Sequence, residues 1–345
     1  MKSIARLCAA GALILALGVS CAYALPPGFV QDFTYKQVDG AVDILKNGSV
    51  VARYVYKDTS RPYIYPLLSP GGLAVTRDFP MKTVEGDQTD HPHQKSMWCS
   101  FGDVNGIDFW AETEKSGKIV QKSIDFDPIS VGPYWSVNTK NDWIMPDGRK
   151  LLEDRRKVAF SSCEYGMLIV TQLTLSASEA ELEFGDTKEG FFALRVVPSM
   201  SITKGKGKIV NSKGDKDNEA WGKRANWVDY TGEVNGKKVG ITIFDSPYNY
   251  GYPTYWHVRD YGLVAANPFG GKEFTGDDKE TSPMTIAYTQ SKKFTYVVLI
   301  HDGDIEPKTL NELAEQVVGS PDKGSAGISK DDAPGSLSTS GTAKD

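Results

Sequence analysis

The sequence is poor in the side chains from which most metal and nucleophile sites are built. It has only four cysteines and four histidines among 345 residues. It contains no Cys-x-x-Cys pair, His-Glu-x-x-His motif, P-loop, glycine-rich dinucleotide motif or nucleophile elbow. These absences argue against zinc ribbons, zincin proteases, nucleotide-binding folds and α/β-hydrolases.

No long block of like charge occurs either. The chain has 39 Lys and Arg residues against 44 Asp and Glu, which gives a formal net charge of −5. Affinity for nucleic-acid phosphates or for an anionic membrane surface requires a basic patch or stripe. We therefore expect neither nucleic acid nor membrane lipid as a partner, whereas a neutral or weakly charged small molecule is compatible with this balance.

After residue 24 no apolar run is long enough to span a membrane. The one prominent run, residues 7–19, follows two basic residues and precedes Ala22-Tyr23-Ala24, the pattern of an export signal cleaved after Ala24. An N-terminal anchor helix and lipoprotein processing at Cys21 are the alternatives. We expect a periplasmic or secreted protein with no transmembrane segment once the signal is removed.

Only two cysteines remain after that cleavage, Cys99 and Cys163. In an oxidising compartment they could form a disulfide. They lie far apart in the sequence, and buried free thiols are the preferred alternative. Neither has the spacing of a metal cluster.

Alternating apolar and polar residues predict β-strands along most of the chain. Asn235-Gly236 lies between two such segments and predicts a hairpin with a type I′ turn. The predicted strands cover residues 33–46, 49–57, 73–76, 118–126, 135–144, 157–165, 167–175, 180–184, 190–197, 208–210, 226–234, 237–244, 284–289 and 293–301.

One helix is predicted, over residues 310–318, with Thr309 as its N-cap and Glu312 completing a capping box. Residues 320–345 are nearly devoid of apolar side chains and are expected to be disordered. The predicted fold is therefore all-β: one large antiparallel β-sandwich over residues 25–319 with a short C-terminal helix. Three insertions would line its concave face, at residues 60–79, 85–110 and 247–271.

The stretch at residues 89–98, TDHPHQKSMW, holds two of the four histidines. Pro92 favours an extended conformation at His91, and residues two apart in an extended segment point the same way. His91 and His93 are therefore expected to face one side. They could bind a divalent metal ion, act as proton donors and acceptors, or only brace the loop by hydrogen bonds.

Further polar and aromatic side chains follow this stretch or gather in a second one. Asp103, Asp108 and Trp110 come soon after the histidines, and residues 253–263, PTYWHVRDYGL, carry several large polar and aromatic groups. Concentrations of this kind in poorly patterned segments are often functional. A surface ion pair between Arg259 and Asp260 beside a core tryptophan is the alternative for the second stretch.

Five motifs resemble one known family in the same order along the chain. They are RPYIYPLL at residues 61–68, DHPH at 90–93, GDVNGIDFW at 102–110, RANWVDY at 224–230, and WHVRDYGL at 256–263 followed by NPFG at 267–270. Together they resemble the PmoA-like family of exported bacterial proteins, over residues 35–305. Gln94 departs from the family pattern, in which a second consecutive histidine is expected.

The family name implies a subunit of methane monooxygenase, but that subunit is a bundle of membrane helices, and no apolar span follows residue 24. The resemblance instead implies a carbohydrate context and a β-sandwich like that of the sugar-mutarotase superfamily. We therefore expect a carbohydrate-active enzyme that cleaves or modifies a glycan or sugar derivative by hydrolysis or elimination. A non-catalytic sugar-binding protein and a metal-dependent oxygenase are the alternatives.

In the expected enzyme, His91 and His93 are acid/base groups or ligands of a divalent metal ion, and His257 lies opposite them. Asp103 or Asp108 is the carboxylate partner. The expected substrate contacts are Arg259, Asn267, Trp110, Trp256, Tyr261 and Arg224.

Overall fold

The structure is a computed structural model, and it describes residues 28, 30, 32–128 and 135–319. The predicted signal peptide at residues 1–24, the alternative lipid attachment at Cys21 and the predicted disordered tail at residues 320–345 lie outside the described residues and stay predictions. In the described part, none of the helices combines the length and apolarity that crossing a membrane requires.

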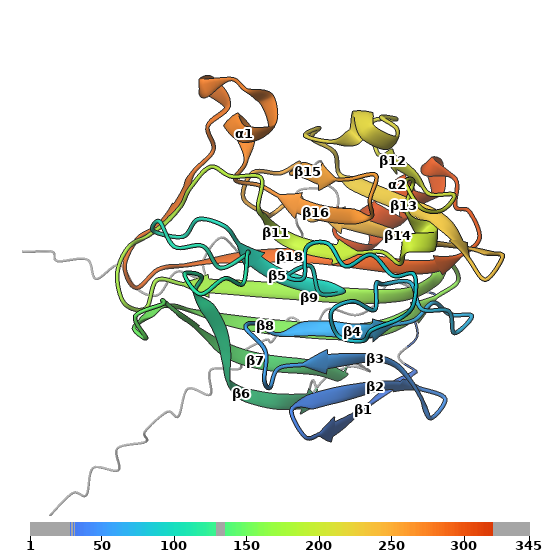
Figure 1. Cartoon of the computed structure of the whole chain (residues 1–345), viewed down its shortest axis with the longest axis horizontal. Helices are drawn as coiled ribbons and strands as arrows, with labels where there is room; N and C mark the ends of the chain where they lie inside the picture. Colours follow the sequence, from blue (N-terminus) through green and yellow to red (C-terminus); the bar gives the residue numbers. More distant parts are fainter. Residues whose placement is uncertain (1–27, 29, 31, 129–134, 320–345) are drawn as a thin grey trace, which may run out of the picture.

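Two eight-stranded antiparallel sheets make up most of the molecule (Figure 1). In spatial order the first sheet consists of β1 (Phe33–Val38), β2 (Ala41–Lys46), β3 (Ser49–Val55), β4 (Tyr63–Leu67), β5 (Met97–Phe101), β11 (Gly190–Arg195), β16 (Leu263–Asn267) and β15 (Tyr255–Val258). The second consists of β12 (Lys208–Asn211), β13 (Trp227–Val234), β14 (Lys237–Asp245), β18 (Ser291–Asp302), β9 (Gly166–Ser176), β8 (Lys150–Cys163), β7 (Trp135–Ile144) and β6 (Lys118–Pro128).

The remaining elements are short. Strands β10 (Leu182–Phe184) and β17 (Met284–Ile286) pair with each other. The helices are α1 (Gly271–Thr275), α2 (Pro307–Val317) and three 3₁₀ turns at Pro198–Met200, Asp217–Ala220 and Asp278–Glu280.

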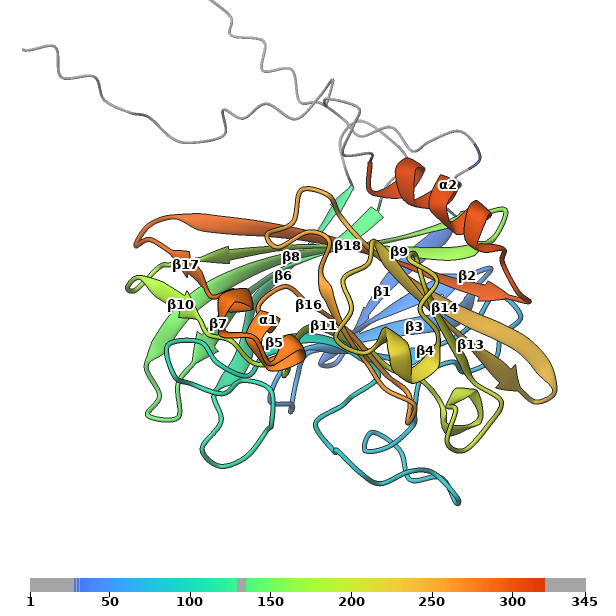
Figure 2. The ribbon, with the colours of Figure 1, turned by 90° about the horizontal axis from the view of Figure 1, so that it is seen from above.

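The two sheets enclose one large apolar core between them. Phe192 of β11, for example, stacks on Tyr296 of β18 with ring centroids 4.8 Å apart. Helix α2 packs on the outer face of the second sheet (Figure 2). Its Leu310 and Leu313 belong to one buried apolar cluster with Trp227 of β13. The predicted antiparallel β-sandwich with a short C-terminal helix is confirmed.

The Asn-Gly hairpin is confirmed as well. Asn235 and Gly236 both have positive φ, at 51° and 75°, as a type I′ turn requires, and they join β13 to β14. The helix, however, begins at Pro307, with Glu306 as its N-cap. Proline suits the first helical position because its N–H is not needed there, so Thr309 lies inside the first turn and the predicted cap was wrong.

Three further expectations about local structure have clear outcomes. Cys99 and Cys163 are free thiols, which decides between the two alternatives for them. The insertions predicted as non-strand contain four strands of the first sheet, namely β4, β5, β15 and β16. The predicted strand at residues 73–76 is reduced to isolated bridges at Ala74 and Thr76.

Candidate functional site

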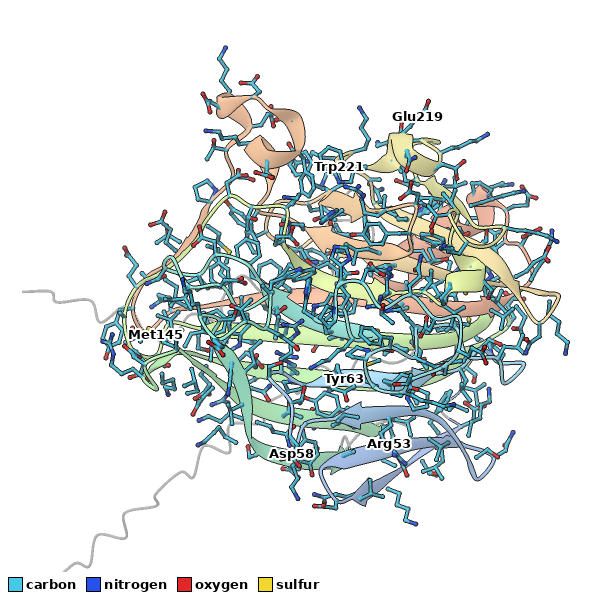
Figure 3. All side chains as sticks on the ribbon, viewed as in Figure 1. Arg53, Asp58, Tyr63, Met145, Glu219 and Trp221 are labelled. Atoms are coloured by element: carbon cyan, nitrogen blue, oxygen red, sulfur yellow. The ribbon has the colours of Figure 1, made fainter. Side chains whose placement is uncertain are left out.

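One face of the first sheet carries five residues in register across β4, β5, β11, β16 and β15. The neighbours along this row are Tyr63 with Trp98, Trp98 with Ala193, Ala193 with Ala265, and Ala265 with His257. Directly opposite residues in antiparallel strands share a face. Tyr63, labelled in Figure 3, stands at one end of the row and His257 at the other. Because alanines occupy the two positions between Trp98 and His257, bulky groups can be accommodated above this part of the row.

Two tryptophans pack on this face. The rings of Trp98 and Trp110 lie 5.1 Å apart, and both belong to a small apolar cluster with Ala193, Leu263 and Ala265. Both indole Nε1 atoms are buried, and neither has a hydrogen-bond partner among the described residues. A buried donor without a partner costs free energy.

A buried arginine, Arg61, ties the histidine loop (residues 85–96) to the segment after β5. Its Nη1 donates to the carbonyl oxygens of Phe109 and Trp110, each at 2.9 Å, and its Nη2 donates to the carbonyl of His93. The guanidinium also pairs with Glu112 at 3.3 Å. Only 1% of Arg61 is exposed, so these contacts replace its hydration.

A second buried arginine, Arg77, binds the backbone of the histidine loop. Its Nη1 donates to the carbonyl oxygens of Gln88 and Asp90, at 3.2 and 2.8 Å. Its Nη2 donates to those of His91 and Gln94, at 2.8 and 3.2 Å. One side chain thereby fixes four carbonyl groups of a segment that has no strand or helix of its own.

A third, Arg195 at the end of β11, binds the side chains of the same loop. Its Nη2 donates to both carboxylate oxygens of Asp90 and to Oε1 of Gln88, each at 3.0 Å, and its Nη1 donates to Oε1 of Gln94. The guanidinium carbon also lies 4.4 Å from the centre of the Tyr261 ring. The glutamine that departs from the family pattern therefore serves as an acceptor for a buried cation.

The histidine loop is a turn at His91 rather than an extended strand. His91 has a φ of +46°, and the amide of Gln94 donates to its carbonyl at 2.9 Å. The expected extended conformation before Pro92 was wrong, because the turn is held by the arginines behind it. The imidazoles of His91 and His93 nevertheless meet edge to face, with ring centroids 5.7 Å apart.

His91 and Asp90 form a carboxylate–imidazole pair through Nδ1 of the histidine. Burial alone would raise the pKa of Asp90, but the contact with His91 and the charges of Arg195 and Arg77 bring it below its usual range. The carboxylate is therefore ionised at neutral pH. A carboxylate on Nδ1 fixes the ring so that Nε2 remains for a substrate.

The other two histidines of the site are uncharged at neutral pH. Burial and the positive charge of Arg61 lower the pKa of His93 to about 4. Burial also lowers the pKa of His257 to about 4. Nδ1 of His257 lies 2.9 Å from the carbonyl oxygen of Lys188. Because a carbonyl only accepts, Nδ1 carries the proton and Nε2 holds a lone pair.

These side chains surround a cleft of about 490 Å³ over the row on the first sheet. A cavity of this size is within the range of small-molecule sites. It is lined by His91, His93, Gln94, Gly102, Asp108, Trp110, Ala111, Lys188, Glu189, His257, Arg259 and Tyr261. The structure thus brings together seven of the predicted site residues, three of them histidines from two distant stretches.

Two predicted residues outside the cleft hold turns. Asp103 accepts a hydrogen bond from the amide of Gly106 at 2.9 Å. Asn267 donates to the carbonyl of Thr187 at 2.8 Å and accepts from the amide of Phe269 at 3.0 Å. Of the two aspartates considered as carboxylate partner, only Asp108 lines the cleft.

Two more lie away from it. Trp256 is in the core between the sheets, with its Nε1 donating to the carbonyl of Ala225 at 2.9 Å. Arg224 donates to the carbonyl oxygens of Pro253 and Gly251, both at 2.8 Å. Both side chains are therefore engaged by the protein itself and do not reach the cleft.

Sequence reasoning missed the three buried arginines, Gln94 as an acceptor, and the pair Lys188–Glu189. Arg61 lies within a motif that we singled out, but nothing in its immediate neighbours signals burial. Lys188 and Glu189 precede β11 in a polar segment typical of a surface turn. Only the placement of β11 beside β5 brings them to the histidines.

A metal site at the two histidines finds no third ligand. Among the described residues no group of three or more His, Cys, Asp or Glu side chains is arranged to hold a metal ion. A metal ion held by His91 and His93 therefore stays a prediction.

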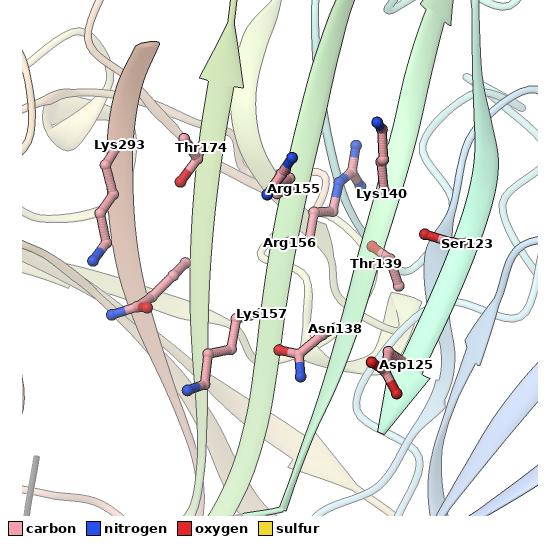
Figure 4. Close-up of a pocket in the computed structure, with 11 residues that line it drawn as sticks. Ser123, Asp125, Asn138, Thr139, Lys140, Arg155, Arg156, Lys157, Thr174 and Lys293 are labelled. Atoms are coloured by element: carbon pink, nitrogen blue, oxygen red, sulfur yellow. The ribbon is translucent and has the colours of Figure 1, made fainter. Parts of the chain in front are cut away.

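A second, shallow groove of about 480 Å³ lies on the outer face of the second sheet, over β6, β7, β8, β9 and β18 (Figure 4). It is lined by Ser123, Asp125, Asn138, Thr139, Lys140, Arg155, Arg156, Lys157, Gln172, Thr174 and Lys293. It has no histidine and no aromatic ring, so it offers neither an acid/base group of neutral pH nor a stacking surface. The cleft on the first sheet is the better candidate.

A model of a family of unknown function, DUF6807, matches residues 41–315. No curated protein matches the chain. The PmoA-like resemblance finds no support in these comparisons.

Solved structures that are similar to the chain are distant. A galactose mutarotase-like protein from Clostridium acetobutylicum has 11% identity and a TM-score of 0.34, with 79% of this chain and 98% of that one covered. A putative aldose 1-epimerase from Escherichia coli K12 has 11% identity and a TM-score of 0.29, with coverage of 80% and 100%. A glycoside hydrolase family 97 enzyme from Pseudoalteromonas sp. strain K8 has 11% identity and a TM-score of 0.34, with coverage of 74% and 34%.

Proposed function

The chain belongs to the DUF6807 family of unknown function, and we propose that it is a carbohydrate-active enzyme that uses the cleft for proton transfer. His91 is the proton acceptor, and the reaction is hydrolysis or elimination at a glycan or sugar derivative. The observation that carries the proposal is the contact between Asp90 and Nδ1 of His91 at the edge of a cleft with two neutral histidines.

The physical argument begins with the base. Asp90 is held ionised by Arg195 and Arg77 and accepts from Nδ1 of His91. An ionised carboxylate stabilises the imidazolium that forms when Nε2 takes a proton. His91 is also partly exposed, so its Nε2 is accessible to a ligand.

His93 and His257 have a different task. Each stays neutral down to pH values near 4, because burial disfavours the imidazolium. A neutral imidazole can donate or accept a hydrogen bond without attracting a counter-ion. These two rings therefore orient substrate hydroxyls, and His91 is the residue that takes up a proton.

Aromatic surfaces support a sugar as the ligand. Trp110 and Tyr261 both line the cleft. Aromatic side chains offer an apolar body for the C–H face of a sugar together with a polar group at the edge. Tyr261 is partly exposed and carries such a group in its hydroxyl. A non-catalytic sugar-binding protein is the second candidate, since these same rings would suffice for binding.

Screening for turnover separates the two candidates. The purified protein is incubated with a panel of neutral and acidic oligosaccharides, and products are detected by mass spectrometry. Turnover that is lost in His91→Ala and in the double variant His93→Ala/His257→Ala supports an enzyme. Lys293→Ala, in the groove on the opposite sheet, is the matched control and retains activity. Binding without turnover would contradict the enzyme and favour the second candidate.

A further inference from the structure

A cluster of cations lies behind the histidine loop. Arg61, Arg77, Lys95 and Arg195 pair there with Asp90 and Glu112. Two further carboxylates, Asp108 and Asp87, act electrostatically on Arg61 and Arg77 without a direct ion pair. The three guanidinium groups are at most 1% exposed, so their charges are weakly screened by solvent. We call this cluster the wall.

The hydrogen-bonding capacity of this wall is not exhausted. The Nε atoms of Arg61, Arg77 and Arg195 are buried and have no partner among the described residues. The positive charge of Arg61 also contributes to keeping His93 neutral. An added cation is therefore disfavoured beside His93, which lines the cleft.

Within the cleft, the carboxylates are already occupied. Asp108 accepts from the amides of Trp110 and Ala111, at 2.6 and 3.1 Å. Glu189 lies 3.6 Å from the ammonium of Lys188, which also pairs with Glu273 at 3.0 Å. Neither carboxylate lies within ion-pair distance of the one further cation in the cleft.

Arg259 is that further cation. It lines the cleft at the end of β15, and its guanidinium carbon lies 5.6 Å from the centre of the Tyr261 ring. Among the described residues it has no carboxylate within ion-pair distance. Tyr261 also stacks on His91, so Arg259 and the proposed base flank one aromatic ring.

We propose that the sugar bound in the cleft is an acid, such as a uronic acid, and that Arg259 binds its carboxylate. The planar guanidinium fork matches a carboxylate in two parallel hydrogen bonds. This inference rests on the proposed function and adds the chemical class of the substrate to it. The charge of the unpaired Arg259 is then neutralised by the ligand.

A carboxylate on Arg259 also favours elimination over hydrolysis. Neutralising the carboxylate makes the hydrogen on the adjacent ring carbon more acidic, so that a base can remove it. His91 Nε2 takes that proton, a C=C bond forms between the adjacent carbon and the next one, and the C–O bond to the leaving group breaks. The leaving oxygen takes a proton from water, and His91 later returns its own proton to solvent. No oxidant, reductant or further reactant is needed.

Ligand-observed NMR with matched sugars tests the substrate class. The probes are D-glucuronate and D-galacturonate, with D-glucose and D-galactose as their neutral counterparts and D-galactose 6-sulfate as a second anion. We expect the uronates to bind and the neutral sugars to bind much more weakly. In Arg259→Gln, uronate binding weakens by roughly ten- to hundredfold, as expected for a charge-assisted contact. Arg155→Gln, an exposed arginine in the groove of Figure 4, is the control and leaves binding unchanged.

Three results would overturn the inference. Equal binding of neutral sugars would show that the charge of the ligand does not matter. Preference for the sulfate would show that the site recognises a sulfate rather than a carboxylate. Loss of uronate binding in Arg155→Gln but not in Arg259→Gln would move the anion site to the opposite sheet. The first two results leave the proposed function standing, whereas a site on the opposite sheet or no binding of any sugar contradicts both proposals. With uronate oligosaccharides, ultraviolet absorbance of a conjugated double bond supports elimination, and saturated products overturn that step.

Discussion

The imidazole of His91 lies flat against the phenol ring of Tyr261, with ring centroids 5.3 Å apart and an angle of 10° between the planes. Arg195 contacts the same tyrosine ring at 4.4 Å. Tyr261 comes from the hairpin between β15 and β16, whereas His91 comes from a loop that has no regular structure. The stack on Tyr261 therefore holds the imidazole of His91, the proposed base, against the hairpin of β15 and β16.

Removing this ring should impair catalysis more than folding. In Tyr261→Ala, His91 loses its stacking partner, and a misplaced base lowers kcat on the order of a hundredfold. Tyr261→Phe keeps the ring and should retain kcat within a few-fold of the natural protein. Steady-state kinetics on a substrate from the oligosaccharide panel measures both. Equal kcat for the alanine and phenylalanine variants would contradict an orienting stack.

The buried arginine at the end of β11 should be essential for stability. In Arg195→Met, Asp90 loses one of its two buried cationic partners, and Gln94 loses a donor. Because 38% of the Asp90 side chain is exposed, solvent screens part of this loss, and we expect a destabilisation of about 1–3 kcal/mol. Urea unfolding measures the free energy directly. Arg155→Met, whose side chain is 69% exposed, is the control and should change it by less than about 1 kcal/mol. Similar losses in both variants would contradict the anchoring proposed for Arg195.

The neutral state of His257 predicts a pH dependence of stability. Its folded-state pKa of about 4 is below the ordinary value of 6.5. A histidine that is held neutral on folding contributes its full stability above pH 6.5, and this contribution is lost as the pH falls towards 4. A shift of this size corresponds to roughly 3 kcal/mol.

The measurement is the difference in free energy of unfolding between the natural protein and His257→Gln, followed from pH 7 to pH 4. We expect this difference to shift by up to a few kcal/mol in favour of the variant as the pH falls. The buried carboxyl of Asp245, whose pKa burial raises to about 7, is present in both proteins and cancels in the comparison. A difference that stays constant with pH would contradict a buried neutral imidazole.

The predictable parts of the fold are the strands in which apolar and polar residues alternate. The hairpin of β13 and β14 has an Asn-Gly turn, and β7 matches its predicted range, because regular alternation marks strands with one exposed face. Strands β5, β15 and β16 are buried at every position, which removes the alternation. These short strands carry the cleft, so the site lies where the pattern is weakest.

The histidines and loops of the candidate site were predictable from the sequence, but the buried arginines that hold them were not. Rare histidines beside aromatic and acidic residues mark His91, His93 and His257 in the sequence. The buried state of Arg61 and Arg77 depends on carbonyl groups that come from segments many residues away. Single-sequence patterns contain no information about such long-range pairings, since an isolated arginine is far more often exposed.

Steady-state turnover by His91→Gln tests the central claim most directly. The substitution keeps a hydrogen-bonding side chain at an exposed position, so folding and sugar affinity should be preserved, and both are checked by NMR. With a substrate from the panel at saturation, we predict that kcat falls by about 10²–10⁴-fold while the affinity for the sugar stays within a few-fold. An unchanged kcat would contradict His91 as the proton acceptor and with it the proposed chemistry of the cleft.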